Sequence, residues 1–562
     1  MDFAALAAEC RDVAFRKTLS KSILWMEAAE TINTYMRQIQ DSIKLVGFDQ
    51  NVENDMQDTD MSEDDHGLGY TFRVDREKTT VKSVCDNVSP IKAKVIDAEQ
   101  VSSQVDALTA VCRFLRNACV ASCDNQDACL DAGLIKIAYD IVLSCCFWMD
   151  VEDEAVKDRV VLLAHVTLQF FVNSVTGNNK NQATVWKLFF PDVFQKVLVE
   201  CHQHRNVVAF TVALILNCVN SNSTVTFEVE EVATRRAELV CARTLVITIL
   251  HRCIVRPQKL DALLPNGLQI DGQDPAFEWI CVLFGVLFRA GHTGDLYNAI
   301  GAHMLSKLWS CVTPEQLILL RMFTMLAISV AEPTSTAATQ EVHGKYVQLL
   351  SEGAFEFVKS TWISIVTTSD DDRPDEADGV RKRMWIELEN EAKLMLLDGL
   401  GELTVGHTRL NAERTRELLL SLAQELHRAW ELGRRNPASH RAPGSTLQLQ
   451  TSGEPVGYRS RLIRVIGNLC FRHTGHQDLM RDNGYLPLLL SHCNIDETNP
   501  FIREWSLVAL RNLCEGNEAN QSYINNLRPQ RMDAASYTAL DKAKACAHFE
   551  EDGAVKLTKQ EK

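Results

Sequence analysis

Asparagine and glutamine recur in this chain at one fixed spacing. Four asparagines are each followed nine residues later by a glutamine, in the pairs Asn117–Gln126, Asn173–Gln182, Asn468–Gln477 and Asn512–Gln521. A carboxamide has two N–H donors and a carbonyl acceptor, so its chemistry is the recognition of other polar groups. Asn217 lies 44 residues after Asn173, which is also the interval between the last two asparagines, but Thr226 takes the place of its glutamine. The spacing predicts four repeats and a fifth that has diverged.

Helical segments are expected to position these amides. Leu462, Val465, Ile466 and Leu469 fall at i, i+3, i+4 and i+7, which is one apolar face of a helix. A period of 44 residues built from helices is typical of armadillo and HEAT arrays. The sequence therefore predicts an all-α, armadillo/HEAT-like α-solenoid that winds as a right-handed superhelix and contains no β-sheet.

The repeated asparagines have two possible roles. In armadillo repeats, the equivalent amide lines a concave groove and bonds the backbone of an extended peptide. Alternatively, each amide bonds a carbonyl of the neighbouring repeat and fixes the stack, because buried amides are usually satisfied within the fold. For the first role, the candidate partner-binding residues are Asn117, Asn173, Asn217, Arg464, Asn468, Arg511 and Asn512.

An aromatic ladder for peptide side chains is missing. Armadillo proteins that carry nuclear-import peptides keep a tryptophan four residues before the groove asparagine. In this chain those positions hold Arg113, Gln169, Ala213, Arg464 and Val508. Trp505 lies seven residues before Asn512 and is expected to pack in the core. A peptide carrier of the nuclear-transport class is the alternative hypothesis, and the missing ladder disfavours it.

Other reactive side chains give no site. Cys201, His202 and His204 lie together, as do Cys470, His473 and His476, but neither group has the paired C-x-x-C elements of a zinc site. Motifs for phosphate loops, nucleophile elbows, zinc proteases and dinucleotides are also absent from the sequence. We expect no enzyme activity, no metal and no cofactor. A metal-handling protein, suggested by the 18 cysteines, is a further alternative.

Composition limits the partners and the compartment. The net charge of −16 disfavours nucleic acid and anionic membranes and favours protein partners. The cysteines lie in apolar helical stretches and no signal peptide precedes them, so reduced thiols in a cytoplasmic protein are expected. The strongly apolar stretch from Trp279 to Phe288 is about half of the ~20 residues that a membrane span needs. No membrane span is predicted.

Segments rich in proline, glycine or charged residues indicate the domain boundaries of the chain. We expect armadillo-like repeats over 1–235 with an acidic, solvated loop at 49–65, degenerate HEAT-like helices over 236–432, a linker at 433–457, a repeat module at 458–530, and a tail at 531–562. Within the module, Asn499 and Pro500 predict a helix N-cap and first helical residue. Gly484 followed by Pro487 predicts the end of one helix and the start of the next.

The module resembles a known family. Its motifs are Gly467-Asn468-Leu469-Cys470, the Gly484-Tyr485-Leu486-Pro487 turn, Cys493-Asn494-Ile495-Asp496, Asn499-Pro500-Phe501, Glu504-Trp505 and Arg511-Asn512-Leu513. They resemble the C-terminal domain of the ataxin-10 family over about 458–530. The resemblance implies a cytoplasmic, non-enzymatic scaffold that binds proteins, including itself, in signalling, cytokinesis, cilia or cell survival.

Two serines are candidate phosphorylation sites. Ser62 and Ser369 are each followed directly by three acidic residues, which acid-directed kinases favour. A phosphate would deepen an already negative segment and change its attraction to basic partners. The alternative is two plain, solvated acidic loops. Phosphopeptide mapping of the native protein that covers both serines and finds them unmodified would remove the hypothesis.

Overall fold

The computed structural model describes most of the chain outside several long connections. The described residues are 1–19, 23–46, 92–95, 97–220, 230–254, 272–301, 312–331, 353–367, 379–405, 412–435, 454–496, 498–527, 538, 540–542, 545–549 and 555–559. The predicted acidic loop at 49–65 and the candidate phosphorylation sites Ser62 and Ser369 lie outside these residues, so they stay predictions. The predicted linker lies partly outside them, and its first three residues belong to a helix that continues to Arg435.

The chain forms two compact units. The first contains Met1–Gln258 and Leu268–Ile300, and the second contains Lys259–Gly267 and Gly301–Lys562. The helices of the first unit are α1 (Phe3–Glu9), α2 (Val13–Thr18), α3 (Leu24–Ser42), α4 (Ala98–Ala118), α5 (Cys123–Asp131), α6 (Leu134–Trp148), α7 (Glu154–Val175), α8 (Asn179–Phe189), α9 (Asp192–Glu200), α10 (Arg205–Val219), α11 (Glu230–Cys241), α12 (Arg243–Ile254), α13 (Phe277–Arg289) and α14 (Thr293–Gly301).

The second unit is built in the same way. Its helices are α15 (Pro314–Ala331), α17 (Gly379–Leu403), α18 (Ala412–Arg435), α19 (Tyr458–Cys470), α20 (Thr474–Asp482), α21 (Leu486–Ser491), α22 (Ile502–Cys514) and α23 (Glu518–Asn525). Residues 353–367 are also helical. The all-α, repeated helical fold is thus confirmed, whereas the armadillo-like detail and the right-handed superhelix stay predictions.

Two small β-sheets correct the expectation of no sheet. Strand β1 (Ile43–Val46) pairs antiparallel with β2 (Lys92–Val95), with Ile43 opposite Val95. Strand β3 (Ala545–Phe549) pairs antiparallel with β4 (Val555–Lys559). Both are isolated pairs at the borders of helical regions. Each strand has only four or five residues, which is too short for an alternating pattern to stand out in the sequence.

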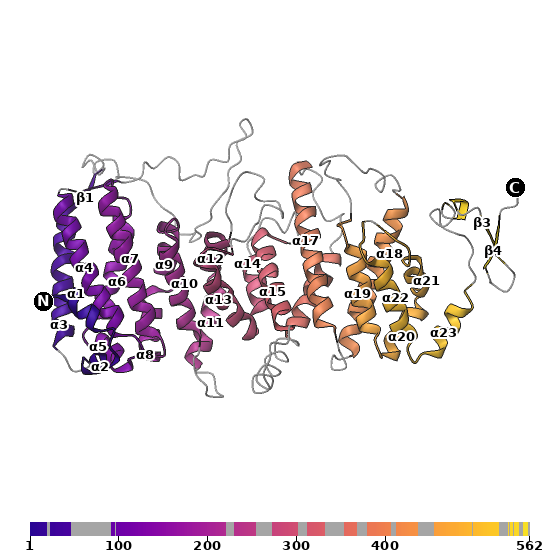
Figure 1. Cartoon of the computed structure of the whole chain (residues 1–562), viewed down its shortest axis with the longest axis horizontal. Coiled ribbons are helices and arrows are strands. Elements are labelled where there is room, and N and C mark those ends of the chain that lie inside the picture. Colours follow the sequence, from indigo (N-terminus) through magenta and orange to yellow (C-terminus); the bar gives the residue numbers. More distant parts are fainter. Residues whose placement is uncertain are drawn as a thin grey trace, which may run out of the picture. The chain divides into compact units, whose positions relative to one another are not determined.

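Long helices that carry the asparagines stack in order. In the first unit α4 packs on α7 and α7 packs on α10, as Figure 1 shows. In the second unit α19 packs on α22, and Leu462, Val465 and Ile466 on α19 are fully buried as their spacing predicts. A Cβ atom on Gly467 would lie 3.1 Å from Cα of Ala509, so only glycine fits this crossing without a shift.

One predicted cap belongs to a different helix. Helix α22 begins at Ile502, after Phe501 in a left-handed conformation with φ of 61°, so Asn499 does not cap it. The Oδ1 atom of Asn499 instead accepts a hydrogen bond from the backbone N–H of Arg459, at 2.9 Å, in the first turn of α19. The predicted turn is confirmed, because Gly484 has a φ of +75° and Pro487 lies in the first turn of α21.

Cysteines in the described part of the chain are unpaired thiols, and many are buried in helix interfaces. Burial raises the pKa of the Cys112 thiol to about 12, which keeps it protonated and inert. Within the described ranges, no helix is both long and apolar enough to cross a membrane.

Candidate interaction surfaces

The repeated asparagines bond the preceding repeat. The Nδ2 atom of Asn512 donates to the carbonyl of Gly467 at 3.0 Å, and that of Asn173 donates to the carbonyl of Arg116 at 2.9 Å. In both cases the acceptor is the residue just before the previous asparagine. Asn217 follows the same rule with the carbonyl of Val172 at 3.4 Å, and it also donates to Thr176 Oγ1 at 3.0 Å. The amides therefore form a ladder across neighbouring helices.

The same rule finds repeats that lack an asparagine. Asn468 donates to the carbonyl of Gly401 on α17 at 3.1 Å, which makes Glu402 the counterpart of an asparagine. Asn117 donates to the carbonyl of Ala7 on α1 at 2.7 Å. These contacts support the structural role that the sequence left open. The partner-binding role of the asparagines stays a prediction.

Two of the glutamines donate in the opposite direction, to the following repeat. Gln477 Nε2 donates to the carbonyls of Cys470 at 3.2 Å, Asn512 at 2.8 Å and Glu515 at 3.2 Å. Gln126 makes the matching bond to the carbonyl of Asn173 at 2.8 Å. Both glutamines are almost completely buried. In these two repeats, the glutamine donates to the next repeat and the asparagine donates to the previous one.

The residue before each glutamine is a third position of the ladder, and the sequence pattern had not been used to predict it. The residue before each glutamine also bonds the interior: Asn181 donates to the carbonyl of Gln126 at 3.0 Å, and Asn520 donates to that of Gln477 at 3.2 Å. The signal was an asparagine directly preceding the glutamine in three of the four repeats, at Asn125, Asn181 and Asn520.

Histidine replaces this asparagine in the fourth repeat. His476 Nδ1 bonds the carbonyl of Leu469 at 2.8 Å, and its Nε2 bonds Thr415 Oγ1 at 3.2 Å. The His473 ring stacks on the His476 ring with centroids 3.7 Å apart, and His473 Nδ1 accepts the backbone N–H of His476. Both nitrogens of His476 are therefore engaged within the fold. Among the described residues, no three His, Cys, Asp or Glu side chains gather as metal ligands would.

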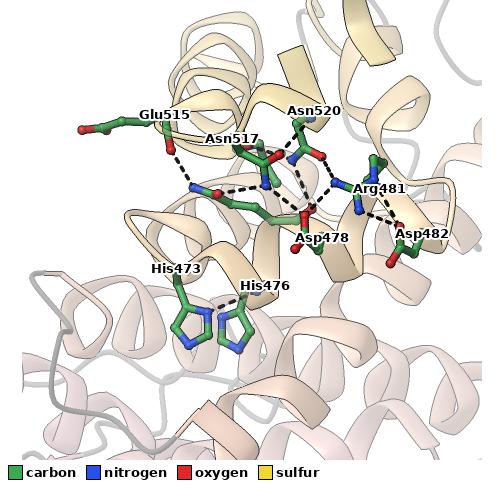
Figure 2. Close-up of polar contacts among 10 residues, drawn as sticks. His473, His476, Asp478, Arg481, Asp482, Glu515, Asn517 and Asn520 are labelled. Carbon is green, nitrogen blue, oxygen red and sulfur yellow. Dashed lines mark hydrogen bonds and ion pairs between the residues drawn. The ribbon is translucent and has the colours of Figure 1, made fainter. Parts of the chain in front are cut away.

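Figure 2 shows how α20 and α23 are joined. Asn517 Nδ2 and Arg481 Nη1 both donate to Asp478 Oδ1, at 2.9 and 2.6 Å. Arg481 also donates to Asn520 Oδ1 at 3.0 Å. The hydrogen bond from Asn517, and then that from Arg481, hold the pKa of Asp478 below its usual value. The first unit has the same link, since Asn178 donates to Asp127 at 2.8 Å.

The two candidate arginines have different surroundings. Arg464 is part-buried, forms an ion pair with Glu402 at 2.7 Å, and lies over the ring of Trp505 with 5.5 Å to the centroid. Trp505 is half-buried against this cation, so the expectation of a core position was only partly right. Arg511 is exposed, and its side chain has no hydrogen-bond or ion-pair partner among the described residues. The structure thus does not bring the two arginines to one common acceptor.

The last repeat leaves an apolar surface uncovered. On α22, Leu507 is 52% exposed and Val508 is 43% exposed, whereas Ile463, the counterpart of Leu507 one repeat earlier, is fully buried. Glu504 and Arg511, one turn before and after this pair, are exposed. We call these four residues the terminal face. The ladder is open here too: within the described part of the chain, Gln521 Nε2 donates only to the carbonyl of its own repeat's Cys514, at 2.8 Å.

The C-terminal module matches a known protein family. Residues 458–558 match the family described as the spinocerebellar ataxia type 10 protein domain. This match extends past residue 530, so it includes most of the segment predicted to be a tail. It also contains the terminal face, α20 and α23.

Relatives align over most of the chain. Ataxin-10 of Xenopus tropicalis is 26% identical over 79% of this chain and 80% of its own. Ataxin-10 of Homo sapiens is 24% identical over 78% of this chain and 79% of its own. An ataxin-10 homolog of Dictyostelium discoideum is 46% identical over 13% of this chain and 12% of its own. With the C-terminal domain match, these alignments show that the chain is similar to ataxin-10 proteins over most of its length.

Proposed function

We propose that this protein is a non-enzymatic, cytoplasmic protein-interaction scaffold that associates with itself through the terminal face. The ataxin-10 family is not known as a family of enzymes, and its repeated helices provide extended surfaces of the kind that bind proteins. The observation that carries the proposal is the uncovered apolar pair at the open end of the ladder. Contexts such as signalling, cytokinesis, cilia or cell survival follow from the family resemblance and belong to the same proposal.

The terminal face has the symmetry of a self-complementary surface. Along α22 its order is Glu504, Leu507, Val508, Arg511, so the acid and the base lie at equal distances from the centre of the apolar pair. Two copies of α22 crossing antiparallel about a two-fold axis would place each Glu504 opposite the other copy's Arg511. The apolar pairs would meet in the middle. This is the isologous arrangement by which most homodimers form.

Stacking of another repeat in the same way is disfavoured. Arg511 is the counterpart of Gly467, where the next helix approaches closely in the preceding repeat. A guanidinium at this position would keep a further repeat away. A two-fold contact places the charge at the rim instead, where an acidic group can meet it. These features support a second copy of the chain as the occupant.

A charge exchange should separate this interface from a general apolar contact. Glu504→Arg places like charges opposite each other and is expected to weaken self-association about tenfold or more. Adding Arg511→Glu to the same chain restores opposite charges across the two-fold axis and should restore association. Light scattering over a concentration series measures both effects. If the double variant associates no better than the single one, the proposed antiparallel geometry is wrong.

A further inference from the structure

Three arginines, Arg11, Arg113 and Arg116, gather on the first unit. Arg113 and Arg116 lie one turn apart on α4, and Arg11 follows α1, which packs on α4. The charges of Arg113 and Arg11 act on Arg116: burial first, and then these two charges, lower the pKa of its guanidinium. Among the described residues, none of the three forms an ion pair. Asp106, two turns before Arg113, is already bonded by Arg159 at 3.1 Å.

The middle guanidinium is held in place by neutral groups. Arg116 Nε donates to Asn117 Oδ1 at 2.9 Å, and its Nη1 donates to Gln169 Oε1 at 2.7 Å. Asn117 is itself fixed by its ladder bond to the carbonyl of Ala7. Amide oxygens orient a guanidinium but do not neutralise it. Arg116 is therefore a positioned cation that keeps its full charge.

A buried polar atom lies beside this cation. His165 is one turn before Gln169 on α7, and its ring packs against Phe210 of α10 with centroids 5.0 Å apart. Its Nε2 atom is buried and has no hydrogen-bond partner among the described residues. Burial and the charge of Arg116 lower the pKa of His165, so the ring is neutral beside the arginines. The cluster thus combines the positive charge of α4 with a polar atom of α7 that has no hydrogen-bond partner among the described residues.

We infer that Arg11, Arg113 and Arg116 form a docking surface for an acidic peptide segment of another protein, whose carboxylates they neutralise. The chain as a whole carries a net charge of −16, so three neighbouring arginines that form no ion pair among the described residues differ from the average surface. Guanidinium groups bind carboxylates through paired, charge-assisted hydrogen bonds. An extended acidic segment relieves the repulsion among the three cations. This surface goes beyond the proposed self-association, and either can fail without the other.

Fluorescence anisotropy with a labelled oligoglutamate peptide tests the inference on the full chain. Wild type should bind it saturably, bind a labelled oligoglutamine peptide weakly or not at all, and release oligoglutamate as salt is added. The Arg11→Glu/Arg113→Glu variant should lose about tenfold or more in affinity. Both side chains are exposed, so the helical circular dichroism and the melting curve should not change.

A matched variant controls for net charge. Arg416 and Arg503 are exposed arginines of the second unit, and Arg416→Glu/Arg503→Glu changes the net charge by the same amount. It should bind oligoglutamate as wild type does, and so should Leu507→Asp on the terminal face. Equal losses in both arginine pairs, or no saturable binding by wild type, would overturn the inference. It would also be overturned if a single-stranded RNA bound the same arginines more tightly, since the surface would then serve nucleic acid.

Discussion

Replacing Gln477 with alanine is expected to weaken the C-terminal repeats by about 2–4 kcal/mol, because several buried groups lose their partner at once. The carbonyls of Asn512 and Glu515 in the next repeat lose a donor, and Asn517 Nδ2 loses one of its two acceptors. Gln477 is only 1% exposed, so water cannot replace these bonds without opening the structure. Hydrogen–deuterium exchange of peptides from α20 and α22 measures the effect locally.

The chain contains its own control for this change. Gln521 holds the same place in the last repeat, but it is exposed and bonds only the carbonyl of Cys514 among the described residues. Gln521→Ala should therefore change exchange little, whereas Gln477→Ala should speed it about thirtyfold or more at the lower end of the expected loss. Equal effects of the two substitutions would show that the link to the next repeat is not what stabilises the domain.

Replacing Gly467 with leucine is expected to cost about 3 kcal/mol or more, because the new side chain must separate α19 from α22. A Cβ atom alone would already lie 3.1 Å from both Cα and Cβ of Ala509. Moving the helices apart also lengthens the bond from Asn512 to the Gly467 carbonyl. Circular dichroism melting of the full chain should show an early transition, with faster exchange in α19 and α22.

Gly399 is a matched glycine in the same unit. It lies within α17, and a Cβ atom there would meet nothing within 4 Å. Gly399→Ala should stabilise the helix by about 0.5–1 kcal/mol, since alanine loses less conformational entropy than glycine. If Gly467→Leu melted like wild type, the close crossing of α19 and α22 would be wrong.

Much of the ladder was visible in the sequence. The nine-residue spacing between asparagine and glutamine is imposed by the helix and turn that separate them, so it is readable wherever both amides are kept. The spacing did not tell which carbonyl each amide meets, since that depends on how two repeats cross. The sequence alone therefore leaves both roles open, and the bond from Asn512 to the carbonyl of Gly467 supports the structural one.

Other features left no pattern to read. Glu402 stands where an asparagine would be expected, and the segment between it and Asn468 breaks the 44-residue period. His476 takes over the bond of an asparagine because an imidazole can also donate and accept. Leu507 is 52% exposed, whereas its apolar type alone favours burial. Asn499 does not cap the helix that follows it, because its side chain accepts a hydrogen bond from Arg459 in the first turn of α19, which is distant in sequence.

Sedimentation velocity of Leu507→Asp/Val508→Asp beside wild type tests the central claim, that the terminal face joins two copies of the chain. Leu432→Asp is the control, because Leu432 on α18 is 47% exposed, close to the terminal pair. Wild type and the control should shift to a faster-sedimenting species as concentration rises, while the double variant stays a folded monomer. A wild-type chain that remains monomeric throughout, or a double variant that associates as wild type does, would contradict the account.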